Sequence, residues 1–80
     1  MLINQIKNYL EQTSLEINIY DNLIHIVNYQ KIISLTNSKI IVKDNLKKII
    51  ITGTSFSLNT LLDSELLVNG KLESLEIKYE

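Results

Sequence analysis

The sequence predicts an all-β fold of seven to eight short, mainly antiparallel strands, in a meander-like sheet or sandwich, with a short N-terminal α-helix. From residue 15 onward, apolar and polar residues alternate with a period of two, which is typical of half-buried strands. Turn residues follow one another at short intervals that leave no room for helical crossovers, so parallel βαβ units are excluded. With 80 residues, the chain is expected to form a single domain over 1–80.

The helix is predicted over residues 1–12, ahead of a β-domain that spans 15–79. Apolar side chains at spacings of three and four form one stripe of an amphipathic helix: Leu2, Ile3, Ile6, Tyr9 and Leu10. An isolated helix of this length is barely stable in water, so its apolar stripe needs a surface on which to pack.

Turn signals divide the rest of the chain into the predicted strands. These strands are residues 15–20, 23–27, 32–36, 39–43, 47–52, 55–59, 65–68 and 71–79. Four residues are expected to be structural turn positions: Asn28, Gly53, Asn69 and Gly70. The strongest signal is Asn69-Gly70, because a two-residue Asn-Gly loop suits a type I′ turn with positive φ at both positions. It predicts a hairpin in which residues 66–68 pair with residues 71–75.

Three predicted strands are apolar on both faces, at residues 40–42, 49–51 and 66–68. A strand with one face in water alternates more cleanly, so the second face of these strands needs cover. We expect a second layer together with a homodimer or higher oligomer. The candidate interface residues are Ile40, Val42, Ile49 and Ile51. The alternative is that the same side chains form an ordinary sandwich core.

The composition excludes several kinds of chemistry. The chain has no Cys and one His, which excludes a disulfide framework, a thiol nucleophile, a Cys-ligated metal and a multi-His metal site. Two glycines are too few for a Gly-rich phosphate loop. We therefore expect no metal, no cofactor and no catalytic residue.

His25 is the one candidate for acid–base chemistry. On a strand over 23–27 it shares a face with Leu23 and Val27, opposite Ile24 and Ile26. A catalytic triad is defined by its geometry, and no nucleophile elbow or similar local motif accompanies this histidine. The sequence therefore predicts a surface histidine, in a protein that is not an enzyme.

Charge is unevenly distributed along a chain whose formal net charge is −1. Residues 31–48 contain five lysines against the single aspartate Asp44: Lys31, Lys39, Lys43, Lys47 and Lys48. One interpretation is a solvated polar face that discourages edge-to-edge pairing of strands. The alternative function is a small β-domain that binds a ligand or nucleic acid through this stretch. Nucleic acid is disfavoured because the chain offers one Phe and no Arg for stacking on bases.

Three stretches carry a further signal. Residues 26–32 (IVNYQKI) are similar to Ile-Glu-Asn-His-Lys-Gly-Ile, residues 49–58 (IIITGTSFSL) to Ile-x-Ile-x-Gly-x-x-Leu-x-Ile, and residues 65–72 (ELLVNGKL) to Glu-x-Leu-x-Val-x-Gly-x-Ile. In this order and spacing they resemble the YabP/YqfC family of small sporulation proteins, in its YqfC-like branch. Within the first stretch Asn28 matches the family pattern, and Val27, Tyr29, Gln30 and Lys31 depart from it.

The resemblance implies a non-enzymatic protein of an endospore-forming bacterium, made in the mother cell. It implies an interaction or scaffold module near the forespore envelope, with a YqfD-like membrane protein as a partner. No catalytic residue is implied, and Asn28, Gly53 and Gly70 carry over as turn positions. Because the longest apolar run is three residues, no transmembrane segment is expected, and we expect a cytoplasmic protein, peripheral at the forespore membrane.

Overall fold

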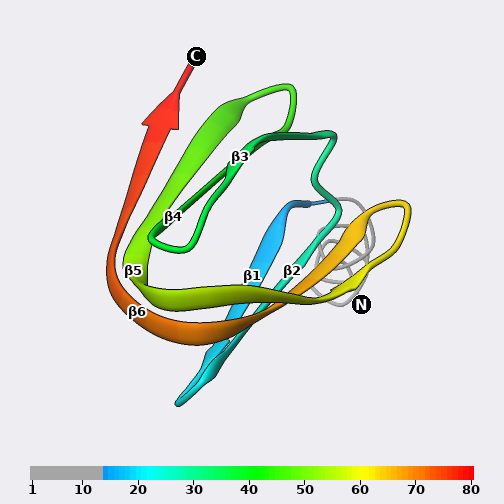
Figure 1. Ribbon diagram of the computed structural model, residues 1–80. Coiled ribbons are helices and arrows are strands. Elements are labelled where there is room, and N and C mark those ends of the chain that lie inside the picture. The colour runs from blue at the N-terminus through cyan, green and yellow to red at the C-terminus, as the bar shows by residue number, and fades with distance from the viewer. Residues whose placement is uncertain (1–13) are drawn as a thin grey trace, which may run out of the picture.

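The computed structural model describes residues 14–80, which form one open antiparallel sheet (Figure 1). Its strands are β1 (Glu16–Tyr20), β2 (Leu23–Val27), β3 (Lys31–Leu35), β4 (Lys39–Lys43), β5 (Lys47–Leu61) and β6 (Glu65–Tyr79). They lie in the order β1-β2-β6-β5-β4-β3, and each neighbouring pair is antiparallel. The all-β prediction is confirmed for this part of the chain. The helix predicted over 1–12 lies outside the described residues.

The described sheet has six strands instead of seven to eight because two predicted breaks fall inside long strands. β5 continues through Gly53 and β6 continues through Asn69-Gly70, and each strand is fifteen residues long. The predicted Asn69-Gly70 hairpin is therefore wrong. The first part of β6 pairs instead with β2 on one side and with the end of β5 on the other. Gly70 has the positive φ expected of it, 141°, but uses it in a bend of the strand.

Both long strands turn sharply near their middle, so the sheet folds over on itself (Figure 1). The register between β5 and β6 shifts between Thr52 and Gly53, where β6 has the extra residue Glu73, and again between Thr54 and Ser57, where β5 has one residue more than β6 and Ser55 has a φ of 59°. Extra residues of this kind are β-bulges, which bend the strand that carries them. The half of the sheet that contains β1 and β2 thereby packs toward the half that contains β3 and β4.

One apolar core fills the space between the two halves. It contains Ile24 and Ile26 of β2, Leu66 and Val68 of β6, Ile40 and Val42 of β4, and Ile49, Ile51 and Phe56 of β5. The candidate interface residues are part of it, because Ile40, Val42 and Ile51 have no exposed surface and Ile49 is 3% exposed. Their assignment to an interface is therefore wrong, and the sandwich-core alternative describes them. The bend brings a second layer from the same sheet over these side chains.

Asn28 joins the two halves of the sheet at the connection between β2 and β3. Its φ of 65° is one that Asn tolerates better than most residues. The backbone N–H of Asn28 donates to the Ser64 carbonyl at 2.8 Å, and its side-chain amide donates to the Ser14 carbonyl at 3.0 Å. The turn is therefore tied both to the β5–β6 connection and to the start of the described chain.

Candidate functional site

The clearest candidate surface consists of apolar side chains that the folded sheet leaves exposed. Ten large hydrophobic side chains of the described residues are exposed: Ile19, Tyr20, Ile33, Leu46, Leu58, Leu61, Leu62, Leu75, Ile77 and Tyr79. Most of them lie on strand segments at a margin of the sheet or in the adjoining turns. Large exposed patches of apolar side chains mark interaction sites on soluble proteins, so these margins are candidate interaction surfaces.

The end of β6 shows most clearly why such side chains are exposed. Leu75 lies opposite Ile51 and Ile77 lies opposite Ile49, so both point to the same face of the sheet as the core. Yet Leu75 is 38% exposed and Ile77 is 45% exposed. The pairing of β2 with β6 reaches only as far as Asn69, which leaves residues 74–79 without a strand on their other side in the described structure. We call the free side of residues 74–79 the β6 edge.

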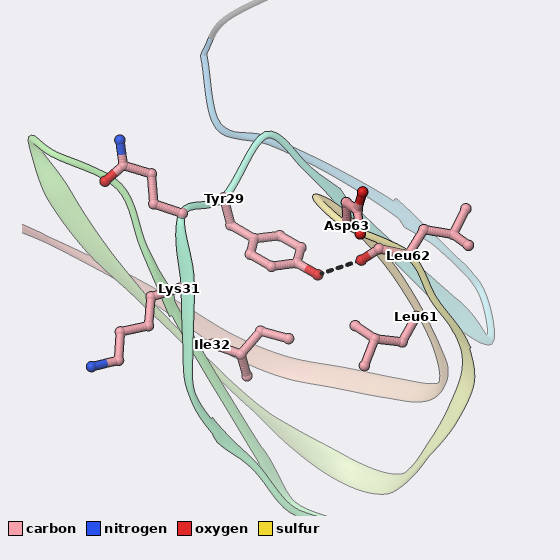
Figure 2. A pocket seen from close by; sticks show the side chains of 7 residues that line it. Tyr29, Lys31, Ile32, Leu61, Leu62 and Asp63 are labelled. Carbon is pink, nitrogen blue, oxygen red and sulfur yellow. Dashed lines mark hydrogen bonds between the residues drawn. The ribbon is translucent and has the colours of Figure 1, made fainter.

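A second candidate surface lies between the β2–β3 connection and the β5–β6 turn. It is an open groove of about 760 Å³, lined by apolar and polar residues: Tyr29, Gln30, Lys31, Ile32, Leu61, Leu62 and Asp63. Figure 2 shows the Tyr29 hydroxyl donating a hydrogen bond to the Leu62 carbonyl at 3.3 Å. Burial, followed by the charge of Asp63, raises the pKa of Tyr29. Specific small-molecule sites enclose most of the ligand, whereas this groove is open to solvent and its wall is divided about evenly between polar and apolar surface.

The lysine-rich stretch contributes a row of charge on the outer face of the sheet. The strand register places four lysines opposite one another across β3, β4, β5 and β6: Lys31, Lys43, Lys48 and Lys78. We call these residues the lysine row. Like charges directly opposite each other destabilise a sheet. Within the lysine row, the Lys43 Nζ atom lies 3.6 Å from the Glu80 carboxylate, which offsets part of this repulsion. Lys47 precedes Lys48 on β5, so its side chain points to the opposite face of the sheet. Its Nζ atom lies 3.0 Å from the Asp44 carboxylate.

His25 takes part in a polar network on the outer face of β1, β2 and β6. Its Nε2 atom lies 2.6 Å from the Glu65 carboxylate, and the Asn18 side-chain amide lies 3.4 Å from its Nδ1 atom. These partners fit a ring that donates from Nε2 and accepts at Nδ1. The side chain is 24% exposed and stands on the face opposite Ile24 and Ile26, as predicted. Among the residues that the structure describes, His25 contacts an amide and a carboxylate and no hydroxyl nucleophile.

Neither a metal centre nor a membrane span emerges from the described residues. No group of three His, Asp or Glu side chains within 14–80 could hold a metal ion. In the same range no helix is long and apolar enough to cross a membrane. The chain matches no protein-family model, no curated protein and no solved structure. Its resemblance to the YabP/YqfC family therefore stays a prediction from the sequence.

Proposed function

We propose that this protein is a non-enzymatic interaction module that acts through the apolar margins of its folded sheet. The observation that carries the proposal is the exposure of Leu75 and Ile77, 38% and 45%, on the face that elsewhere forms the core. A β-domain of this size has a small core of its own, and association with another chain is one way to cover the rest of its apolar surface.

The biological setting of the module is proposed from the resemblance to the YabP/YqfC family. On that basis the protein acts in sporulation, in the cytoplasm of the mother cell near the forespore membrane. A YqfD-like membrane protein is the proposed heterologous partner. The support for this setting is the order and spacing of the three similar stretches, from residue 26 to residue 72.

Site-specific photo-crosslinking in sporulating cells tests the interaction module. A photoreactive amino acid replaces Ile77 or Leu61 in separate variants of the full chain. The matched control is Thr60, which is exposed on β5 next to Leu61 and opposes Leu67 on the outer face. We expect adducts of defined mass from the two apolar positions and none from Thr60. No adduct at either apolar position, or equal labelling at Thr60, would contradict the proposal.

The lysine row favours a second candidate function, the binding of an anionic ligand such as single-stranded nucleic acid. The strand register aligns its four lysines across four strands, and contacts between lysine and phosphate weaken as salt rises. Fluorescence anisotropy with a labelled single strand tests it. We expect Lys31→Gln with Lys48→Gln to weaken a salt-sensitive affinity several-fold. Lys47→Gln is the control, because Lys47 pairs with Asp44. Binding that ignores salt, or equal loss in the control, would contradict this candidate.

A further inference from the structure

We infer that a second copy of this chain pairs with the β6 edge, antiparallel and in one register, with Ile77 of both copies at the two-fold axis. This inference rests on the proposed interaction function and adds the partner, the strand and the contacts. The result is a sheet that continues from one copy into the other.

The backbone of the β6 edge is available for pairing. The Glu80 N–H donates to the Leu46 carbonyl at 2.9 Å, so the residues of β6 that bond to β5 are the even-numbered ones near this end. Bonding alternates along an antiparallel strand, which leaves the N–H and C=O groups of Leu75, Ile77 and Tyr79 pointing away from β5. In the described structure no other strand runs beside these groups. A row of unpaired backbone groups is a template for another strand.

The other free margins of the sheet are less suited to pairing. β3 has a register shift between Ile32 and Ser34, and the end of β5 has a shift between Leu58 and Thr60. Bulges of this kind protect an edge by twisting its hydrogen-bonding groups away. β1 has only five residues. From Ser74 to Tyr79, by contrast, β6 keeps an unbroken register with β5, and Figure 1 shows this red segment at the margin of the sheet.

Charge complementarity selects the register. In a symmetric antiparallel pair, one residue faces its own copy and its neighbours face one another across the axis. With Ile77 at the axis, Glu76 faces the partner's Lys78, and Lys78 faces the partner's Glu76, on the outer face. Leu75 then faces the partner's Tyr79 on the core face. Opposite charges across two strands stabilise the pair.

Neighbouring registers lack this match. With Glu76 or Lys78 at the axis, a side chain faces a like charge from the other copy. With Leu75 at the axis, Ile77 faces the partner's Glu73, a residue skipped in the register between β5 and β6. Pairing centred on Ile77 therefore places opposite charges on one face and apolar side chains on the other.

Charge reversal tests the pairing by sedimentation of the full chain. We expect Glu76→Lys and Lys78→Glu each to weaken self-association at least tenfold, because each variant places like charges opposite each other. A mixture of the two variants restores association, since each chain then supplies the charge that the other lacks. The control is Glu73→Lys, which makes the same charge change as Glu76→Lys outside the paired segment and leaves association unchanged.

Cysteine crosslinking tests the register, because the natural chain contains no Cys. In the proposed pair the two Ile77 Cα atoms are about 5.5 Å apart, within the range that a disulfide spans. Ile77→Cys therefore forms a disulfide-linked dimer under mild oxidation. Leu75→Cys does not, because its two copies are about 14 Å apart along the strands. A mixture of Leu75→Cys and Tyr79→Cys chains crosslinks.

The outcomes separate this inference from the proposed function. A monomer at all concentrations that still gives an adduct with another protein at position 77 overturns the pairing and supports the interaction module. An adduct from position 77 to residues 1–13 of the same chain also overturns the pairing. A dimer that the two charge reversals leave intact, or that crosslinks through Leu75→Cys alone, overturns the register.

Discussion

Phe56 packs so closely over Gly53 that a Cβ atom at position 53 would lie 2.5 Å from the Cζ atom of the ring. The same Cβ atom would collide with the backbone carbonyl oxygen of Lys71 on the neighbouring strand. The ring also covers Gly70, where a Cβ atom would lie 2.5 Å from Cδ1. One buried aromatic ring and two glycines on adjacent strands therefore form the bend that folds the sheet.

Gly53→Ala is expected to lower the free energy of unfolding by about 2 kcal/mol or more, because the Lys71 backbone has to move to admit the methyl group. Chemical denaturation measures the change. Adding Phe56→Leu removes the contact with the ring but not the collision with the backbone, so the double variant does not recover. The control, Ser57→Ala at an exposed position of β5, changes stability by less than about 0.5 kcal/mol. A wild-type midpoint for Gly53→Ala would show that the bend does not need glycine.

The sequence predicts the strands and most turns because the signals for them are local. Turn signals define the bounds of β1 to β4 within a residue or two, because short polar segments such as Asn37-Ser38 separate these strands. The bend is not local. Gly53 and Gly70 acquire their role only because β5 and β6 run side by side around Phe56, and this pairing joins residues distant in sequence. From local patterns alone, a glycine at either position therefore predicts the end of a strand.

The exposure of side chains at the candidate surface is likewise not predictable from local sequence patterns. Leu75 and Ile51 oppose each other on one face of the sheet. Ile51 is nevertheless fully buried while Leu75 is 38% exposed, because Ile51 has β4 beyond it and Leu75 has no further described strand. The strand order decides this difference in exposure, and local sequence patterns do not specify the strand order. The apolar triplets predict an interface at residues that lie in the core, whereas the exposed margin lies in the alternating segment 75–79.

Core and edge side chains are expected to respond differently to truncation. Ile40→Ala removes a fully buried side chain and lowers the free energy of unfolding by about 2–5 kcal/mol. Ile77→Ala, at a position that is 45% exposed, costs the fold less than about 1.5 kcal/mol. Thermal and chemical unfolding of each variant at low protein concentration measures the difference. Equal losses would contradict the assignment of Ile40 to the core and Ile77 to the edge.

Asp44 is expected to make stability depend on acidic pH. Burial alone would raise the pKa of Asp44, but hydrogen bonds from the Leu46 N–H, the Lys47 side chain and the Lys47 N–H, with the Lys47 charge, hold the pKa below its ordinary value of 3.8. A lowered pKa in the folded state stabilises the fold above the unfolded-state pKa, and this stabilisation is lost as pH falls through the folded-state pKa.

Asp44→Asn is therefore expected to lower the free energy of unfolding by about 1 kcal/mol at neutral pH and to match the wild type in strong acid. Denaturation from neutral pH to about pH 2 follows the difference. Asp21→Asn, in the exposed β1–β2 turn, is the control and changes the free energy of unfolding at neutral pH by less than about 0.5 kcal/mol. A constant gap between Asp44→Asn and the wild type at every pH would mean that the charge of Asp44 does not stabilise the turn.

Tyr29 is expected to produce the opposite dependence, at alkaline pH. Burial, together with the Asp63 charge, raises its pKa above the ordinary value of 10.0, and its hydroxyl donates to the Leu62 carbonyl at 3.3 Å. A raised pKa means that the neutral phenol stabilises the fold fully below the unfolded-state pKa, and that this stabilisation is lost as pH rises through the folded-state pKa.

Tyr29→Phe is expected to cost about 1 kcal/mol at neutral pH, through the lost hydrogen bond, and to close this gap as the wild type loses stability above about pH 10. Denaturation at several pH values from about 8 to 11, with the tyrosinate absorbance of the folded protein, follows both effects. Tyr20→Phe is the matched control, because that side chain is 58% exposed and the substitution removes no described hydrogen bond. If Tyr29→Phe and the wild type lose stability in parallel up to pH 11, the Tyr29 hydroxyl does not link the β2–β3 connection to the β5–β6 turn.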